Sequence, residues 1–449
     1  MKNIYKSQGI QFENDAAQEE YVHVSRFFTI TERRAPSPFF PARDNLSPEK
    51  KLFKHIKNYR NTNGLSLYIH IPFCDRKCLF CDLYSFQLPR NNLKDTDTYT
   101  RALEQEINRW GELYHWAAIP VTTIHFGGGS PLVLPSENLH SIIKTLEKHF
   151  FINDSTEIAV EITSSQIMNE NILLLKQLSV SRIHIGVQTL SDPIRKLIGR
   201  REPRATVKNK LKKIVNEDFI VSVDILYGLP LQTLQEFVAD IHELIETGLD
   251  GFALYELQIS PRMRTLIKNN PAYHISKSLS YQMFIKAKTI LNNTGYRTVF
   301  FNHFGNNRDK NLYFTYPSRG EDCLAFGTIA DSRLETVFFR HMNYKKYLDA
   351  ISKGGFGIDY GYREDDRRTL IRKFETCLMS GFIPESEINQ MQQSFGYKFK
   401  GIFDLWRVAK LIVPGHKHGD FELTGSGCWL VSTMMEHTRD IENNWYNWL

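Results

Sequence analysis

The sequence has no run of about twenty apolar residues, the length that a helix needs to cross a bilayer, and we expect no membrane-spanning segment. It also lacks a dense stripe of lysine and arginine, and a net charge of +6 over 449 residues is modest, which argues against nucleic acid as a partner. The first 20 residues are polar and lack the apolar core of a secretion signal. We therefore expect a globular protein of the reducing cytoplasm.

Cysteine is scarce, with six in the whole chain, yet Cys74, Cys78 and Cys81 stand together as C-x-x-x-C-x-x-C. A structural zinc site would need a fourth ligand at the right spacing, and the nearest histidine, His70, lies on the strand expected before the loop. A disulfide would need an oxidising compartment. Three thiolates from one short loop instead suit three irons of a 4Fe-4S cluster, whose fourth iron stays open for a substrate or cofactor. The remaining cysteines are isolated and are interpreted as ordinary buried thiols: Cys323, Cys377 and Cys428.

Short apolar runs alternate with helical patterns along much of the chain. Segments 98–114 and 137–150 have helical spacing and are long enough to connect parallel strands. Such alternation predicts the α/β fold class, as an incomplete (β/α)6 barrel whose site gathers at the carboxyl ends of its strands. The six runs that predict its strands are LSLYIHI, TTIHFGGG, EIAVEIT, SRIHIGVQ, FIVSVDILYG and GFALYELQI.

We divide the chain into three parts. Residues 1–60 mix charge, aromatics and proline without a sustained period and are interpreted as an N-terminal extension. Residues 61–332 form the partial barrel, and residues 333–449, rich in charged helical patterns, form a mainly helical C-terminal domain.

A glycine run and four polar residues fall at or beyond the ends of the predicted strands. Gly127, Gly128 and Gly129 in HFGGGSP would let backbone amides approach a ligand, although a glycine run can also be a flexible turn. A carboxylate in an apolar strand is costly unless it is paired, and an arginine can bind a ligand carboxylate with two hydrogen bonds. Together these residues predict a ligand with amine, carboxylate and hydroxyl groups. The four polar residues are Glu161, Gln188, Arg200 and Asp224.

In this order, the cysteine spacing, the glycine run, VQTLSDPIRKLIGR and VDILYGLPLQT resemble the radical S-adenosylmethionine (SAM) superfamily. More narrowly, they resemble its branch typified by oxygen-independent coproporphyrinogen III dehydrogenase. The resemblance covers residues 65–332 and, more weakly, the C-terminal domain through ELTGSGCW. It implies a 4Fe-4S cluster that cleaves SAM to methionine and a 5′-deoxyadenosyl radical, with electrons from a donor such as flavodoxin or ferredoxin.

The resemblance also implies residue roles. Cys74, Cys78 and Cys81 would bind the cluster, and Tyr68 matches a tyrosine on the cluster side of the site. Ser130 stands where the family more often has threonine. The implied contacts to SAM are Gly127, Gly128, Gly129, Ser130, Glu161, Gln188, Arg200 and Asp224.

This branch also binds a second SAM molecule near the first. Phe314 and Asp331 differ in type from the corresponding residues of the dehydrogenase. Aromatic packing and a capping carboxylate are the alternative interpretation of these matches. The candidate contacts in this chain are Gln258, Tyr313, Phe314 and Asp331.

Two departures from the family pattern narrow the choice among the activities found in the family. The decarboxylating members carry a further cysteine two residues after the third ligand, where this chain has Leu83, and the related haem chaperones are shorter and begin close to the cysteine loop. The class C radical methyltransferases usually lack that cysteine, and ERRAPSPFFP resembles an N-terminal segment of members that open haem anaerobically.

The resemblance therefore favours a radical SAM methyltransferase that moves a methyl or methylene group from a second SAM to an sp2 carbon of haem or another tetrapyrrole. The alternatives are a coproporphyrinogen III dehydrogenase, a haem chaperone, and a C-methylase or cyclopropanase of a quinone or natural product. His303, His416 and His418 could bind haem iron, although scattered histidines are more often surface or core residues.

Overall fold

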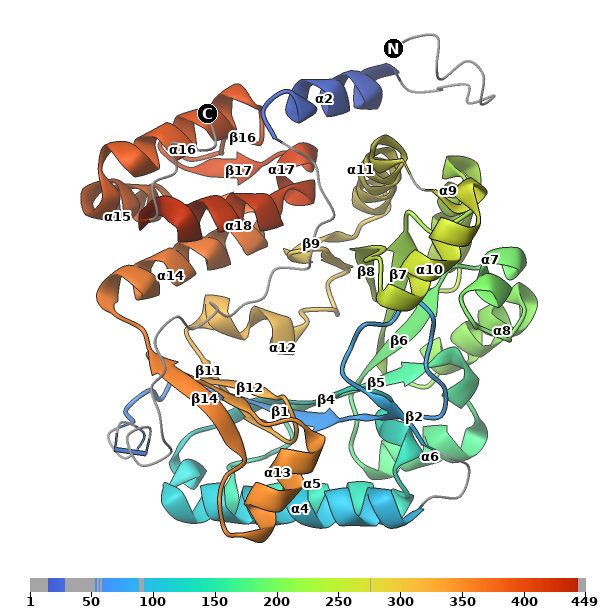
Figure 1. Ribbon diagram of the computed structural model, residues 1–449, viewed down its shortest axis with the longest axis vertical. Helices are drawn as coiled ribbons and strands as arrows, with labels where there is room; N and C mark the ends of the chain where they lie inside the picture. Colours follow the sequence, from blue (N-terminus) through green and yellow to red (C-terminus); the bar gives the residue numbers. More distant parts are fainter. Residues whose placement is uncertain are drawn as a thin grey trace.

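The computed structural model describes residues 15–28, 53–54, 56, 59–88, 93–274 and 276–442 (Figure 1). Most of the predicted N-terminal extension, including ERRAPSPFFP at residues 32–41, lies outside these described residues. Among the described helices, none is both long and apolar enough to cross a membrane.

Six parallel strands, each hydrogen-bonded to the next, form the centre of a 12-stranded sheet. They coincide with the six runs that the sequence predicts as strands, which confirms the incomplete α/β barrel. Most of their residues are buried, as expected for parallel strands covered on both faces. The strands are β1 (Leu65–Ile71), β4 (Val121–Gly128), β5 (Glu157–Thr163), β6 (Arg182–Gln188), β7 (Ile220–Tyr227) and β8 (Gly251–Glu256).

Further strands extend the sheet at both edges. Beside β1 lies the parallel β11 (Asp322–Phe326), followed by the antiparallel β12 (Asp331–Leu334), β13 (Val337–His341) and β14 (Ile358–Arg363). Beside β8 lie the antiparallel β10 (His303–Gly305) and β9 (Arg297–Phe300). The boundary predicted at residue 332 therefore falls inside β12, and the sheet continues for about thirty residues beyond it.

Helices pack on the outer face of the sheet (Figure 1). In α5 (Ser136–His149) the buried Leu139, Ile142, Ile143 and Leu146 recur at helical spacing and form the stripe that faces the strands. The other helices of this part are α4 (Leu93–Leu113), α6 (Asn169–Gln177), α7 (Asp192–Leu197), α8 (Arg204–Val215), α9 (Leu234–Ile245), α10 (Pro261–Asn269), α11 (Lys277–Asn293) and α13 (Tyr344–Ser352). The short α12 (Leu312–Thr315) lies instead on the inner side of the sheet (Figure 1).

The C-terminal region is mainly helical from residue 366 on. Its aromatic core includes Trp406, Phe374 and Phe399, and a three-stranded sheet lies beside the helices. The strands are β15 (Phe382–Ile383), β16 (Ile412–Pro414) and β17 (Phe421–Leu423). The helices are α14 (Asp366–Ser380), α15 (Glu385–Phe395), α16 (Tyr397–Val408), α17 (Gly425–Trp429) and α18 (Val431–Arg439).

The N-terminal helix α2 (Asp15–Ser25) packs against α11 and α17. The Ser426 hydroxyl lies 2.7 Å from the Tyr281 hydroxyl and donates a hydrogen bond to Glu20. The rings of Tyr21 and Trp429 meet edge to face, 6.2 Å apart. Two segments from opposite ends of the chain therefore meet on the same helix of the barrel.

A buried carboxylate connects the barrel to its edge strands. Glu106 of α4 accepts a hydrogen bond from Tyr347 Oη (2.6 Å) and another from Gly327 N (3.0 Å), and its Oε1 lies 2.6 Å from His341 Nε2. Burial alone would lower the pKa of His341, but the neighbouring Glu106 carboxylate raises this pKa above its ordinary value. The protonated form of His341 is therefore favoured, and these contacts join α4, β13 and α13.

Replacing Glu106 by alanine is expected to lower the free energy of unfolding by about 3–5 kcal/mol, because it leaves a buried positive charge and two donors without an acceptor. The midpoint of thermal unfolding, followed by circular dichroism, measures the loss. Glu112→Ala, at an exposed position of the same helix, is the control and should change the midpoint little. Equal midpoints for the two variants would show that the Glu106 network does not stabilise the fold.

Candidate functional site

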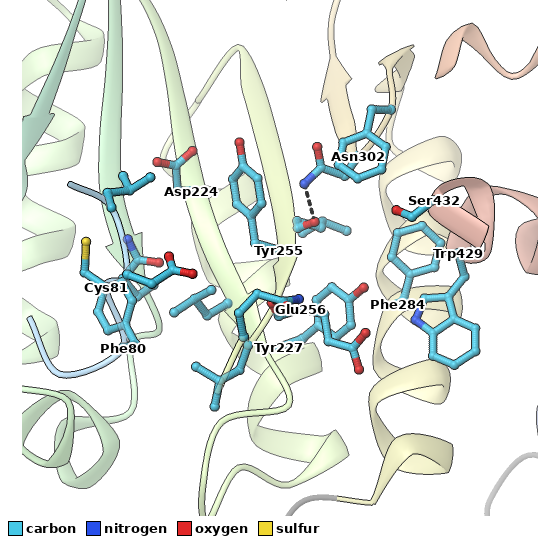
Figure 2. A pocket seen from close by; sticks show the side chains of 18 of the residues that line it. Phe80, Cys81, Asp224, Tyr227, Tyr255, Glu256, Phe284, Asn302, Trp429 and Ser432 are labelled. Carbon is cyan, nitrogen blue, oxygen red and sulfur yellow. Dashed lines mark hydrogen bonds between the residues drawn. The ribbon is translucent and has the colours of Figure 1, made fainter. Parts of the chain in front are cut away.

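A cavity of about 400 Å³ lies where the carboxyl ends of β5 to β8 meet the C-terminal helices. Figure 2 shows Phe80 and Cys81 on one side of it and Phe284 and Trp429 on the other, with Asp224 between them. Its position agrees with the strand-end site expected of an α/β barrel. The predicted site residues that line it are Cys81, Glu161, Gln188, Asp224, Gln258 and Phe314.

The three clustered cysteines lie in a loop, residues 72–88, that we call the cysteine loop. It contains β2 (Phe73–Cys74) and β3 (Phe86–Gln87), which pair in parallel. The loop is fixed at its base by Leu88 N, which donates to Cys74 O (3.0 Å), and in its middle by Lys77 Nζ, which donates to Ser85 Oγ (2.6 Å). The sequence therefore folds into a preformed turn rather than an open segment.

All three thiols are free and half-buried. Burial raises the pKa of both Cys74 and Cys81, and Cys78 acts on each of them electrostatically, so the three groups are neighbours. Within the described part of the chain, no three histidine, cysteine or acidic side chains converge as they would on one metal ion. A 4Fe-4S cluster does not require that convergence, because each cysteine binds a different iron.

The glycine run joins the end of β4 to the cysteine loop. Gly129 N donates to Ile71 O and Ser130 N to Phe73 O, both at 2.7 Å. A Cβ on Gly129 would lie 2.3 Å from Phe73 O, and one on Gly127 would lie 2.8 Å from Glu161 Oε1. Gly129 is therefore required by the close approach of two backbones, whereas Gly127 leaves space for the Glu161 carboxylate.

Glu161 and Asp224 bring two carboxyl groups to the same cavity. Glu161 of β5 lies 2.9 Å from His125 Nε2 and accepts a hydrogen bond from Gly128 N (3.2 Å), and its side chain is 34% exposed. Burial, and then the neighbouring Glu161 carboxylate, raise the pKa of Asp224 to about 7, against the opposite effect of Arg200. Asp224 can therefore hold or release a proton near neutral pH.

Gln188 and Arg200 lie together over the end of β6. A Cβ on Gly186 would be 2.9 Å from Gln188 Nε2 and 3.2 Å from an Arg200 terminal nitrogen. The Arg200 guanidinium lies 5.9 Å from the Phe80 ring of the cysteine loop, and its Nε is buried without a hydrogen-bond partner. The buried Arg195 holds this turn by donating to Val187 O (3.0 Å) and Thr189 O (2.8 Å).

These features fit the groups of an amino acid cofactor. Arg200 offers a cation and an unsatisfied donor to a carboxylate, and Glu161 has exposed acceptor surface for an amine or hydroxyl. Gly127 keeps free the space that a Cβ would occupy beside Glu161. Ser130 is turned elsewhere, since its hydroxyl donates to Gln166 Oε1 at 2.7 Å.

A second cavity, of about 210 Å³, lies inside the barrel beside the first. Glu161, Asp224, Tyr255 and Phe314 line both cavities, so the two are neighbours with a common wall. Of the residues predicted for a second SAM, Tyr313, Phe314 and Asp331 line this cavity, whereas Gln258 lines the first. Three of the four residues predicted to bind a second SAM therefore lie around the second cavity.

A row of stacked aromatic rings runs from Tyr68 on β1, the strand before the cysteine loop, to Tyr313 at the second cavity. The ring of His125 stacks on that of Tyr313 at 4.2 Å and on that of Tyr68 at 5.9 Å. The Tyr68 hydroxyl lies 3.0 Å from His70 Nδ1, and burial lowers the pKa of His70 to about 4, so His70 is neutral. Tyr68 is therefore positioned by His70 and by His125, of which the sequence analysis did not single out His125.

Sequence reasoning missed several residues of the site. His125 precedes Gly127 by two positions on one strand, so the alternation of side chains could have placed it inside the barrel. Tyr255 lies on the predicted strand β8, two positions after Ala253, so the same alternation could have placed it inside the barrel. Asn302 and Trp429 had no such signal; Asn302 lies between strands, where its side chain donates to Leu254 O at 2.6 Å (Figure 2).

The histidines considered for haem iron do not lie together. His303 is buried in the barrel, with Nε2 2.7 Å from Asp309 Oδ2. His416 and His418 are exposed between β16 and β17. Of the isolated cysteines, Cys323 and Cys428 are buried as expected, whereas Cys377 is only partly so.

Comparisons with known proteins agree with this geometry. Residues 68–244 match the radical SAM superfamily. The chain is 27% identical over 340 residues to the oxygen-independent coproporphyrinogen III oxidase of Synechocystis sp., covering 71% of this chain and 72% of that protein. It is 28% identical over 293 residues to the anaerobilin synthase of Escherichia coli O157:H7, covering 64% of this chain and 65% of that protein.

A chaperone and a solved structure are also similar. The heme chaperone HemW of Bacillus subtilis is 25% identical over 350 residues, covering 75% of this chain and 89% of that protein. The structure of coproporphyrinogen III oxidase (HemN) from Escherichia coli, a radical SAM enzyme, superposes with a TM-score of 0.75 at 21% identity, covering 87% of this chain and 93% of that one. This similarity establishes the fold.

Replacing Cys78 by alanine is expected to abolish stable assembly of a 4Fe-4S cluster, because two thiolates from the loop cannot hold three irons. Iron and sulfide content and the visible absorption of the anaerobically reconstituted protein measure this. Cys377→Ala, outside the loop, is the matched control and should keep the cluster. A cluster of normal content in the Cys78 variant would contradict the assignment.

Asp224→Asn is expected to stabilise the protein at pH 8 by about 1–3 kcal/mol and to change little at pH 4. The native chain holds this proton up to about pH 7, whereas the unfolded chain loses it near pH 4, so wild-type stability falls as the pH rises through that window. Melting midpoints across the pH range measure the difference. Asp154→Asn, at an exposed turn, is the control, and a parallel change in both variants would contradict the raised pKa of Asp224.

Proposed function

We propose that this chain, which carries a radical SAM domain, is a methyltransferase that moves a methyl or methylene group from a second SAM to an sp2 carbon of a tetrapyrrole. The cofactors of the domain are a 4Fe-4S cluster and SAM. The observation that carries the proposal is the pair of adjoining cavities, which share the wall made by Glu161, Asp224 and Tyr255. Two neighbouring cavities suit two molecules that must react with each other.

The site residues divide into three groups by what they would hold. Cys74, Cys78 and Cys81 would bind the cluster. At the edge of the first cavity, Gln188 of its lining and the neighbouring Arg200, which lies outside the lining, would bind the carboxylate of SAM, while the backbone beside Gly128 and the Glu161 carboxylate would bind its amine. In the second cavity, the acceptor would be Asp331, and the stacking surface would be Tyr313 and Phe314. When bound, the cluster and the two SAM molecules supply a 5′-deoxyadenosyl radical and the carbon that is transferred.

The protein's own groups position the reactants and move protons. Glu161 is oriented by His125 and Gly128 N, so it presents a fixed carboxylate to the cavity. Asp224, which belongs to the same shared wall and has a pKa of about 7, can take up or return a proton in either cavity. Aromatic and apolar residues of the lining exclude water, which protects a reactive site from side reactions.

The charge of the first cavity indicates which part of a substrate enters it. Its lining contains Asp82, Glu161, Asp224 and Glu256 and, among the described residues, no lysine, arginine or histidine. A cationic sulfonium and an apolar ring are therefore favoured against this lining, and a carboxylate is disfavoured there except at the edge beside Arg200. We propose that the ring of the tetrapyrrole enters this space while its propionates stay outside.

The named relatives support a tetrapyrrole substrate. Anaerobilin synthase and coproporphyrinogen III oxidase are similar to this chain over most of its length. Leu83, where the decarboxylating members carry a cysteine, lines the first cavity and is 56% exposed. It offers no thiol for decarboxylation chemistry and favours group transfer. Coproporphyrinogen oxidation is the second candidate, favoured by the Synechocystis relative.

The deciding experiment counts products under anaerobic conditions. Reconstituted protein, a reductant and SAM are incubated with haem or with coproporphyrinogen III, and 5′-deoxyadenosine and S-adenosylhomocysteine are quantified separately. Methyl or methylene transfer predicts that both products rise with haem. Asp331→Asn, at a position that lines the second cavity and not the first, should lower S-adenosylhomocysteine formation about tenfold or more while deoxyadenosine formation continues.

Other outcomes would redirect the proposal. Deoxyadenosine without S-adenosylhomocysteine, together with decarboxylated coproporphyrinogen, would identify the dehydrogenase. Neither product above the background of Cys78→Ala, with tight haem binding, would identify a haem carrier.

A further inference from the structure

A row of buried polar side chains lies at the amino ends of the strands, the opposite end of the barrel from the site described so far. Ser66, Thr123 and Glu157 are register partners on the neighbouring parallel strands β1, β4 and β5. Ser66 stands two positions before Tyr68, and Thr123 two before His125, so both face the barrel interior like those stacked rings. We call Ser66, Thr123 and Glu157 the polar row.

Each member of the polar row keeps one polar atom without a protein partner. Within the described residues, Ser66 Oγ, Thr123 Oγ1 and Glu157 Oε1 have no hydrogen bond, although Glu157 Oε2 lies 3.0 Å from Arg182 Nε. All three residues are buried. Leaving buried polar atoms unsatisfied costs free energy, and such atoms usually bind ordered water. Because paired strands are about 4.8 Å apart, one water can hydrogen-bond to two neighbouring members of the row.

One end of the polar row meets the second cavity. Ser66 is also the register partner of Cys323, which lines that cavity. Asn311 lines it too, directly before α12, and α12 packs against β4 (Figure 1). Asn311 is buried, its side chain does not cap α12, and neither polar atom of that side chain has a partner in the described part of the chain. It can therefore bind water between the second cavity and the row.

The other end of the polar row reaches an open groove of about 760 Å³ at the amino ends of β5 and β7. Glu157 lines this groove together with Lys310 and Leu312. Lys310 and Leu312 are the chain neighbours of Asn311, so at this point a single residue separates the groove from the second cavity. The polar row thus connects the second cavity with solvent at the far end of the barrel.

We propose that the polar row, with water bound between its members, is the path by which protons leave the second cavity. The inference rests on the proposed function, in which a methyl group replaces the hydrogen of an sp2 carbon. In net terms a carbon–carbon bond forms, the carbon–hydrogen bond breaks, its electron pair stays with the substrate, and the hydrogen leaves as a proton. Asp224 lines the second cavity and can accept that proton. Hydroxyls and waters pass it on, because each can accept one proton and donate another, and Glu157 releases it to the groove.

A path at this end of the barrel suits a site that is closed at the other end. The first cavity is bounded by the C-terminal helices through Trp429 and Ser432, and SAM and the substrate would fill the space in front of the second cavity. Exclusion of water on that side protects a radical from side reactions. Protons that leave through the polar row do not require the first cavity to open.

The test combines a crystal structure with kinetics. The ligand-free wild-type protein is crystallised, and the density is searched for waters within hydrogen-bonding distance of the unpartnered oxygens of the polar row. Thr123→Val removes a hydroxyl from the row with little change of shape, and Thr123→Ser keeps it. The matched control is Thr122→Val, on the same strand but on its opposite face, where the hydroxyl donates to Glu321. Cluster content and SAM binding are measured first in every protein.

We expect ordered water at the polar row in the wild-type crystal. In the anaerobic assay, Thr123→Val should form S-adenosylhomocysteine at least about fivefold more slowly than wild type, because departure of the proton becomes slow. For the same reason, the ratio of its rates in H2O and D2O should exceed that of wild type. Thr123→Ser and Thr122→Val should both stay within about twofold of the wild-type rate.

Three results would overturn the inference. The polar row could be dry in the crystal. Thr123→Val could be as fast as wild type, so that a hydrated row would carry no protons that the reaction needs. Thr123→Ser could be as slow as Thr123→Val, so that the hydroxyl would not be the cause. If wild type forms no S-adenosylhomocysteine, the proposed function fails instead; the crystal then decides, since a hydrated row supports the path and a dry one overturns it.

Discussion

The close approach of two backbones beyond the ends of β1 and β4 determines the geometry of the whole site. Gly129 N and Ser130 N hydrogen-bond to the carbonyls of Ile71 and Phe73, so the cysteine loop starts from a fixed position on the sheet. No side chain fits at Gly129. The same turn places Gly128 N against Glu161, so the cysteines and the carboxylate are set relative to each other by one short segment.

The polar residues of the site depend on a barrel that is otherwise apolar. Burial raises the pKa of Asp224 because β7 carries it into an apolar core with another carboxylate nearby. Away from the site, buried charges are paired: Glu106 with His341, and Arg182 with Glu157 and Asp309. Asp224 differs from these pairs because it has no close counter-charge. Burying such a group costs folding free energy, and groups with a perturbed pKa of this kind are frequent at functional sites.

The sequence predicted the strands and the residues that follow them, since hydrophobic alternation and strand ends are local signals. Glu161, Gln188 and Asp224 were found in this way, and all three line one cavity. Residues brought by distant segments were not found: Trp429 belongs to the far end of the chain, and Asn302 to a turn between antiparallel strands. The extent of the sheet could not be predicted from the sequence either, because β13 joins it through pairing with β12, and β14 through pairing with β13.

The wall formed by Cys428, Trp429 and Ser432 has a consequence for how the protein is made. Synthesis on the ribosome runs from the N-terminus, so the cysteine loop and all six parallel strands emerge while this wall does not yet exist. Ser426 can meet Glu20 and Tyr281 only near the end of translation. The nascent barrel therefore presents the Cys81 side of the cysteine loop to solvent until the last helices close over the cavity.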